Sequence, residues 1–383
     1  MLPRPATNPL PSFLAAALLL VPGCSDKPEE TGRAGAPDEP RKLRFSLLWR
    51  KNSTDKEDGF SASPAVSADK IFLASNNGTI AALSAADGGI VWRSRPASGF
   101  SATPVAGGGR IFIGSLDGTF LALDSKTGET LWKADVGAKI AGSAAVVESK
   151  DATVVVFGAY DRTLHCLNAA NGAKRWSFKT KGFINGRPVA VGGSIVFGGC
   201  DGHLRRLDAT TGKVIWSFDA GSYIPGSPAV SGDRVFVATH GGKVFAVSLD
   251  TGKKLWEFSD DESSPAFFAA PTAGEGLPLM VPSDDGALYA LSQKTGRLLW
   301  KIKLPGVANA PPLVLDKRHA ATTDDSGALT LISLNDGSTL AEKNLGEPFE
   351  NSPALADGTI FAASEEGSIF AITADAGESA STR

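Results

Sequence analysis

The stretch of sequence that decides the fold is SPAVSGDRVFVATHGGKVFAVSLDTGKKLWEF, residues 227–258. It holds four short apolar or alternating runs, at 228–230, 234–238, 243–247 and 254–258, which glycine-containing turns separate. Each run is too short for a helix and has the length and the alternation of a β-strand. This stretch therefore predicts four consecutive antiparallel strands.

The same stretch recurs along the chain, and a tryptophan marks each copy. All seven tryptophans occupy one phase of the repeat, 40 to 44 residues apart: Trp49, Trp92, Trp132, Trp176, Trp216, Trp256 and Trp300. A repeat of this length indicates a propeller or a solenoid. Because Trp is large and rigid and its indole N–H needs a partner, we expect these residues to have a structural role, docking one blade on the next.

Glycine pairs mark the turns between the strands. The turns between the second and third strands include Asn77-Gly78, Asp117-Gly118, Asp201-Gly202 and Asp285-Gly286. Such pairs supply the positive φ that a two-residue hairpin requires. Because no helical pattern intervenes, each unit is expected to be a four-stranded meander, which is one propeller blade.

The two ends of the chain set the number of blades. The last unit has three strands and stops at Asp375-Ala376-Gly377, whereas 45–50 forms a strand with no unit before it. One end therefore supplies the strand that the other lacks, which leaves no open edge. We predict an all-β, eight-bladed β-propeller of four-stranded antiparallel blades, closed by the N-terminal strand. The seventh unit carries Ala341 where Trp is expected, so its seam should be weaker.

The N-terminal residues are expected to lie outside this fold. An apolar run at 13–21 ends in Val21-Pro22-Gly23-Cys24, which resembles a lipoprotein signal with Cys24 as the lipidated residue. A plain secretory signal with an incidental cysteine is the alternative. We expect a lipoprotein signal peptide at 1–23, a lipidated cysteine with a disordered polar tether at 24–40, and the propeller at 41–383.

The pattern Leu-Asp-x-x-Thr-Gly-x-x-x-Trp, at 123–132 and 207–216, resembles the repeat of the PQQ-like (quinoprotein) propeller family. The resemblance covers nearly all of residues 43–377 and implies one of two functions. One is that of the PQQ-dependent alcohol and sugar dehydrogenases. The other is that of the BamB-type lipoproteins, which belong to the outer-membrane β-barrel assembly machinery. With Ser25 after Cys24, the resemblance implies an outer-membrane lipoprotein that faces the periplasm; another envelope membrane is the alternative.

The dehydrogenase group implies a quinone held between a Trp floor and a vicinal cysteine pair, beside Ca²⁺ bound by Glu, Asn and Asp. This chain has no adjacent cysteines, and its tryptophans are all assigned to the blades. Its four histidines lie in four different units without metal-ligand spacing. We therefore expect no cofactor, no metal and no enzymatic activity. A net charge of −3 without a basic stripe also argues against nucleic-acid binding.

Polar residues before the innermost strands are the candidates for a site in the central channel. They are either the lining of a wet channel or a site for a small ion: Asn185, Arg187, Asn309, Glu350 and Asn351. In addition, Cys166 and Cys200 lie in neighbouring units and either form a disulfide or remain free thiols.

Aromatic and basic residues near the connections are the candidate partner contacts: Phe183, Tyr223, Phe267, Phe268, Arg205 and Arg206. We expect one of the two arginines to point outward, because Arg is favoured at interface anchors. The alternative for the aromatic residues is that they pack inside the ring. Pairing of a client strand with a sheet edge is a second binding mode.

Together these observations predict a non-catalytic, lipid-anchored scaffold for envelope proteins. The expected partners are the outer-membrane barrel-assembly machinery or its clients. A periplasmic PQQ-dependent or small-ligand-binding quinoprotein, or its accessory subunit, is the alternative.

Overall fold

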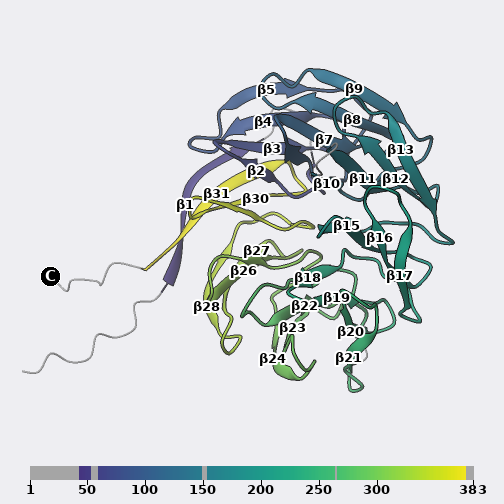
Figure 1. Ribbon diagram of the computed structural model, residues 1–383. Helices are drawn as coiled ribbons and strands as arrows, with labels where there is room; N and C mark the ends of the chain where they lie inside the picture. Colours follow the sequence, from purple (N-terminus) through teal and green to yellow (C-terminus); the bar gives the residue numbers. More distant parts are fainter. Residues whose placement is uncertain (1–42, 53–58, 149–152, 264, 377–383) are drawn as a thin grey trace, which may run out of the picture. The chain divides into compact units, whose positions relative to one another are not determined.

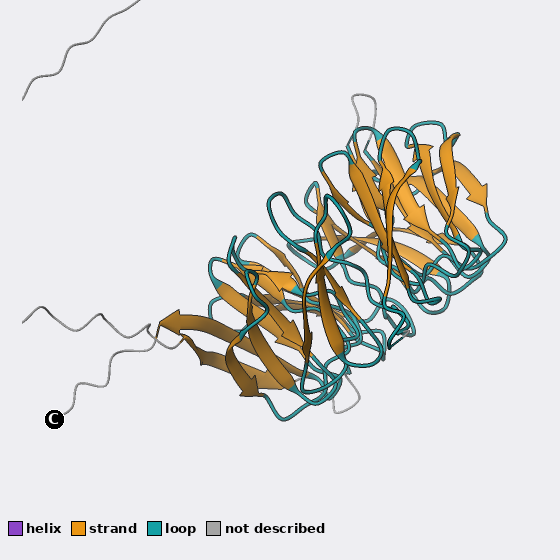
Figure 2. Cartoon of the chain, turned by 90° about the horizontal axis from the view of Figure 1, so that it is seen from below, coloured by secondary structure: helices purple, strands orange, loops and turns teal. Residues whose placement is uncertain are grey.

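The computed structural model describes residues 43–52, 59–148, 153–263 and 265–376. The expected signal peptide, Cys24 and the tether lie outside these residues. Every regular element in the described part is a β-strand, and Figure 2 shows strands joined by loops without a helix. The strands form eight antiparallel sheets. Each sheet is one blade, and the blades form an eight-bladed β-propeller (Figure 1).

The first four blades are regular four-stranded meanders. Blade 1 comprises β2 (Ala65–Ser67), β3 (Lys70–Ala74), β4 (Ile80–Ser84) and β5 (Ile90–Ser94). Blade 2 comprises β6 (Val105–Gly107), β7 (Arg110–Gly114), β8 (Thr119–Asp124) and β9 (Thr130–Asp135). Blade 3 comprises β10 (Ala145–Val147), β11 (Val154–Gly158), β12 (Thr163–Asn168) and β13 (Lys174–Lys179). Blade 4 comprises β14 (Val189–Val191), β15 (Ser194–Gly198), β16 (His203–Asp208) and β17 (Val214–Asp219).

The remaining blades follow the same order, with one exception in blade 6. Blade 5 comprises β18 (Ala229–Ser231), β19 (Arg234–Ala238), β20 (Lys243–Ser248) and β21 (Lys254–Ser259). Blade 6 comprises β22 (Leu279–Pro282), β23 (Ala287–Leu291) and β24 (Leu298–Lys303). Blade 7 comprises β25 (Leu313–Val314), β26 (His319–Thr323), β27 (Ala328–Ser333) and β28 (Thr339–Asn344). Blade 8 comprises β29 (Ala354–Ala356), β30 (Thr359–Ala363), β31 (Ser368–Ala376) and β1 (Leu43–Asn52).

Blade 6 departs from the predicted four strands, because its innermost strand is reduced to one bridge between Thr272 and Met280. The residues that follow Thr272 include Gly274 and Gly276, and glycine weakens a strand. The side chain of Gln293 compensates by donating hydrogen bonds to the carbonyl oxygens of Gly274 at 2.8 Å and Leu277 at 2.7 Å.

The N-terminal strand closes the ring as the sequence predicts. β1 pairs with β31 from Leu43 opposite Ala376 to Asn52 opposite Ser368. Figure 1 shows this purple strand beside the yellow end of the chain. The paired strands are longer than expected, because β1 spans Leu43–Asn52 instead of 45–50 and β31 continues through Asp375 and Ala376, where the last unit was expected to stop.

A buried carboxylate reinforces this closure. Glu347, in the connection from blade 7, forms an ion pair with Arg50 of β1 and accepts hydrogen bonds from Ser364 and Ser368 of blade 8. The Glu347 side chain is only 8% exposed. The Arg50 guanidinium also lies over the ring of Phe370, 5.0 Å from its centroid. One carboxylate thus joins the two ends of the chain to the neighbouring blade.

Each tryptophan packs on the next blade. Six of the seven indole N–H groups donate to a backbone carbonyl of that blade, as Trp256 does to Gln293 at 2.9 Å and Trp216 to Leu249 at 2.7 Å. The exception is the Trp49 indole nitrogen, which is buried without a hydrogen-bond partner among the described residues. The seam between blades 8 and 1 is therefore less completely bonded than the other Trp seams.

The seam without a tryptophan is filled differently. Ala341 packs at the edge of a buried cluster that includes Phe45 of β1, Leu331 and Phe370, and Leu43 also contacts this cluster. The long strands β1 and β31 supply apolar side chains where the other seams have an indole ring. We therefore attribute the small residue at position 341 to the route that these two strands take.

Removing the indole N–H should cost more at a bonded seam than at the unbonded one. We expect Trp256→Phe to lose about 1 kcal/mol more unfolding free energy than Trp49→Phe, because it leaves the Gln293 carbonyl without its donor. Urea unfolding of both variants measures the difference. Equal losses would show that the indole hydrogen bond adds no stability.

Neutralising the buried carboxylate should weaken ring closure. We expect Glu347→Gln to reduce the free energy of unfolding by about 1–3 kcal/mol, since Arg50 loses its charged partner. Glu342→Gln, at an exposed position of β28, is the matched control and should change stability by less than about 0.5 kcal/mol. Thermal and urea unfolding check both values.

Candidate functional site

One face of the propeller carries the connections that enter each blade, together with the hairpin turns between the second and third strands. We call it the connection face. In a meander successive connections lie at alternate ends of the strands. The turns between the first and second strands and between the third and fourth strands therefore lie on the opposite face. The segments that enter each blade are longer than the turns within a blade, so the connection face presents more loop side chains than the opposite face.

A single repeat position gives this face its chemistry. It lies two residues after each blade's second strand, and its backbone N–H donates to a carbonyl oxygen of the connection that enters the same blade. This bond leaves the side chain free to vary. From blade 1 to blade 8 the position holds Asn76, Leu116, Tyr160, Cys200, His240, Asp284, Asp325 and Glu365. The face is therefore divided into an aromatic part around blades 3–6 and an acidic part around blades 6–8.

The aromatic part is built by ring contacts between neighbouring loops. Tyr160 stacks on Phe183 with ring centroids 4.9 Å apart, and Tyr223 lies 6.2 Å from His240. His240 in turn meets Phe268 edge-on at 5.0 Å. We call these five residues the aromatic arc. Because the rings support one another, they are held in place before any partner arrives.

Basic side chains flank the aromatic arc. The Lys139 ammonium lies 5.3 Å from the centroid of the Tyr160 ring, and the Arg162 guanidinium lies 5.9 Å from that of Phe183. These distances suit cation–π attraction. The arc thus combines aromatic area with positive charge.

Three of the candidate partner contacts lie exposed on this arc. Phe183 is 41% exposed, Tyr223 59% and Phe268 49%. Phe267 is a correction, because it is fully buried and packs edge-on against Tyr289 at 5.7 Å. Its backbone N–H donates to the Thr239 carbonyl, which turns its side chain into the seam and the next side chain outward.

The two arginines also differ from expectation, because neither points outward. Arg205 forms a bidentate ion pair with Asp201 at 2.7 and 2.9 Å, and its side chain is 11% exposed. Arg206 donates to the Ser194 hydroxyl at 2.7 Å and to the Leu249 carbonyl at 2.8 Å. Both arginines therefore hold the protein together. Burial raises the pKa of Asp201, but the hydrogen bond and charge of Arg205 outweigh it, and the pKa is lowered overall.

A carboxylate pair marks the acidic part. Burial raises the pKa of Glu365, and the neighbouring Glu350 raises it further by charge and by a hydrogen bond. With Asp284 and Asp325 these residues form what we call the acidic arc. Both aspartates accept a hydrogen bond at 2.8 Å from the backbone of the connection entering their blade, Asp284 from Ala266 and Asp325 from Val307.

The five channel candidates do not form one site. No hydrogen bond or ion pair joins any two of them in the described structure. Asn185, Asn309 and Glu350 precede the innermost strands of three blades. Arg187 is solvent-accessible, yet desolvation by the protein atoms around its guanidinium lowers the pKa of this group. Asn351 is a correction, because it is 4% exposed and donates to the carbonyl oxygens of Phe60 at 2.7 Å and Ala363 at 2.9 Å.

The residues present do not fit a quinone–calcium site. The tryptophan side chains lie in the seams, and within the described part of the chain no three His, Cys, Asp or Glu residues gather as metal ligands. Cys166 and Cys200 are both free thiols. Burial raises the pKa of Cys166 to about 12, and Cys200 accepts a hydrogen bond from Asn185 at 3.6 Å. No reaction step can therefore be assigned to a quinone here.

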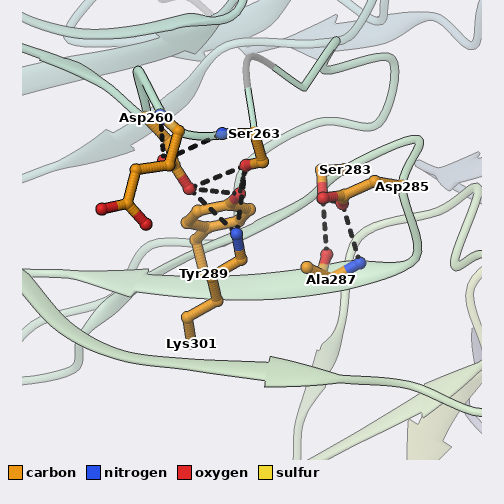
Figure 3. A network of polar contacts seen from close by, with 8 residues as sticks. Asp260, Ser263, Ser283, Asp285, Ala287, Tyr289 and Lys301 are labelled. Carbon is orange, nitrogen blue, oxygen red and sulfur yellow. Dashed lines mark hydrogen bonds and ion pairs between the residues drawn. The ribbon is translucent and has the colours of Figure 1, made fainter.

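A polar network that sequence reasoning missed anchors the loop carrying Phe268. Figure 3 shows Asp260 and Ser263 converging on the Tyr289 hydroxyl and the Lys301 ammonium. The Asp260 carboxylate accepts from Tyr289 at 2.8 Å and from Lys301 at 2.9 Å. The Lys301 hydrogen bond lowers the pKa of Asp260. The only signal in the sequence is Tyr289 at a position that is apolar or charged in most other blades.

The outer strands form a further surface. Each has a bulge at the residue before its tryptophan position. Large apolar side chains are exposed along these strands: Leu47, Leu48, Ile90, Val91, Leu131, Val214, Ile215, Leu255, Leu298 and Leu299. The outer sheet edges therefore carry apolar side chains beside unpaired backbone groups.

Comparison with known proteins identifies relatives of this fold. The family model described as the beta-propeller of the beta-alanine-activating enzyme matches residues 97–382. BamB from Moraxella catarrhalis has a TM-score of 0.72 at 20% identity, covering 86% of this chain and 97% of its own. Quinohemoprotein alcohol dehydrogenase ADHIIG from Pseudomonas putida HK5 has a TM-score of 0.70 at 14% identity, covering 88% and 77%.

The designed protein Ika8 is also similar, with a TM-score of 0.72 at 17% identity, covering 84% of this chain and 98% of its own. At these identities the solved structures share the fold alone. A search of curated proteins finds no match. Within the described residues, no helix is long and apolar enough to cross a membrane.

The carboxylate pair gives a pH prediction. Because the pKa of Glu365 is raised, between the ordinary glutamate pKa and the raised value the folded protein holds a proton that the unfolded chain has released. The free energy of unfolding therefore falls as the pH rises through this range. Glu350→Gln should lower the pKa of Glu365 and reduce this loss, whereas Glu366→Gln, at an exposed position, should do less. Carboxyl-carbon NMR titration measures the pKa, and an unchanged value in Glu350→Gln would contradict the pairing.

Proposed function

We propose that this chain, which belongs to the beta-propeller family described for the beta-alanine-activating enzyme, is a non-catalytic scaffold. In this proposal it docks proteins on its connection face. The observation that carries the proposal is the aromatic arc. Three large rings, Phe183, Tyr223 and Phe268, are 41–59% exposed on the connections that enter blades 4, 5 and 6. Aromatic residues of this kind are the usual anchors of protein interfaces.

The division of the connection face adds specificity. The aromatic arc is flanked by Lys139 and Arg162, whereas the acidic arc holds four carboxylates. A partner with exposed apolar side chains and acidic groups beside them would complement the aromatic arc. The acidic arc would repel a partner docked in the wrong orientation.

We place this scaffold in the cell envelope, with the barrel-assembly machinery or its clients as partners. The proposal rests on the lipoprotein-like signal that ends at Cys24 and on the fold shared with a protein named BamB. The exposed apolar side chains on the outer strands support strand-edge pairing as a second way to hold an unfolded client. An outer-membrane anchor facing the periplasm is part of the same proposal.

The test is binding of purified chain to reconstituted barrel-assembly machinery. We expect the combined Phe183→Ser, Tyr223→Ser and Phe268→Ser variant to bind at least about tenfold more weakly, because each ring is an anchor. Lys294→Ser, at an exposed turn of the opposite face, is the control and should bind like the native chain. Surface plasmon resonance measures both affinities.

Three results would each contradict part of the proposal. Equal binding by the triple variant and the native chain would exclude the aromatic arc as the docking surface. Saturable binding of PQQ with Ca²⁺, together with dye-linked oxidation of an alcohol or sugar, would replace the scaffold with the dehydrogenase function. Failure to bind the machinery at all would remove the assembly role.

A further inference from the structure

A cavity of about 280 Å³ lies in the seam between blades 8 and 1, away from the aromatic arc. Phe60, Leu73 and Leu83 form part of its apolar wall, and Ala81 lies in the wall as well. Lys51 and Arg93 lie at its edge, where the side chains are exposed. The cavity is therefore an apolar space with cationic side chains at its mouth.

Comparison across the blades shows why the cavity exists. Ala81 lies on β4 and faces blade 8. The same position in blades 2 to 8 holds larger side chains: Leu121, His165, Arg205, Phe245, Tyr289, Thr330 and Phe370. Alanine is thus the smallest residue at this place in the repeat, and the space that a larger side chain fills elsewhere is left open.

Two other blades show what fits this space. In blade 6, Tyr289 occupies the position, and the Lys301 ammonium of the next strand lies 4.6 Å from its ring centroid. In blade 8, Phe370 occupies it, and the Arg50 guanidinium lies 5.0 Å from its ring. Each is an aromatic ring beneath a cation that also bonds a carboxylate.

Blade 1 has alanine at this position and a cationic side chain opposite it. Arg93 pairs with Ala81 across β4 and β5, in the register that Lys301 and Arg50 have opposite their rings. An aromatic ring below a guanidinium gains cation–π attraction as well as apolar burial.

The seam between blades 8 and 1 also lacks a hydrogen bond that the other Trp seams have. Trp49, which packs on Gly88 at this seam, has an indole N–H with no partner in the described structure, whereas the other six tryptophans are bonded. Gly88 itself lines the cavity. This seam therefore lacks both a large side chain at position 81 and the indole hydrogen bond that the other tryptophans make.

We propose that this seam cavity binds a small molecule with a single planar aromatic ring, which takes the place of the side chain missing at position 81. An engineered apolar cavity of about 150 Å³ is enough to bind benzene. The cavity here is larger and open at one side, so a ring with a polar substituent directed to the mouth also fits. The proposal does not depend on the docking function of the connection face.

The test uses phenol as the probe and cyclohexanol as a non-aromatic comparison. In the native chain, phenol should shift the methyl NMR signals of Leu73, Leu83 and Ile369 saturably, and should leave those of Ile113 and Leu123 at the next seam unchanged. Cyclohexanol should bind more weakly, because it has no π-face for the cationic side chains at the mouth.

Ala81→Phe should lower the affinity for phenol at least about tenfold, because the chain's own ring then fills the cavity. Ala86→Phe, which adds the same ring at an exposed position, is the matched control and should bind phenol like the native chain. Ala81→Leu, which copies Leu121 of blade 2, serves if the phenylalanine variant does not fold. Absence of saturable shifts in the native chain, or undiminished binding by the position 81 variants, would overturn the proposal.

Discussion

The structure depends on one contact, an indole ring of one blade lying on a glycine of the next. These glycines have positive φ, from 69° to 77°, and a Cβ added to any of them would come within 2.4–2.8 Å of an atom of the indole that packs on it. Only glycine satisfies both the backbone and the space. The Trp and the Gly are therefore one unit split between two blades, which explains why the sequence repeats both together.

Once the seams are fixed, the loops are free to differ. The repeat position on the connection face bonds through its backbone, so its side chain can be Tyr160, His240 or Asp325 without a change of fold. This separation lets one rigid ring carry an aromatic part and an acidic part. The docking surface that we propose is a property of these loops, and the ring only holds them in place.

Apart from the reduced innermost strand of blade 6, the departures of the ring from its own repeat lie near the two chain ends. Ala341 replaces a tryptophan beside the long strands β1 and β31, and Ala81 opens the cavity between blades 8 and 1. A buried Glu347, bonded to Arg50, Ser364 and Ser368, strengthens the same region. Closure joins segments from opposite ends of the chain, so the standard seam is supplemented there by a charged group and by longer strands.

The sequence by itself determined the all-β propeller, its eight blades and its closure by the N-terminal strand, because period, Trp and Gly are local signals that repetition multiplies. Only the tertiary structure decided that Phe267 is buried while Phe268 is exposed, that Arg205 and Arg206 turn inward, and that Asn351 joins two blades. The partners of these side chains belong in part to other blades or to the far end of the chain, as Leu249 does for Arg206 and Phe60 for Asn351. The direction of a single side chain follows from such distant contacts, which no repeat pattern contains.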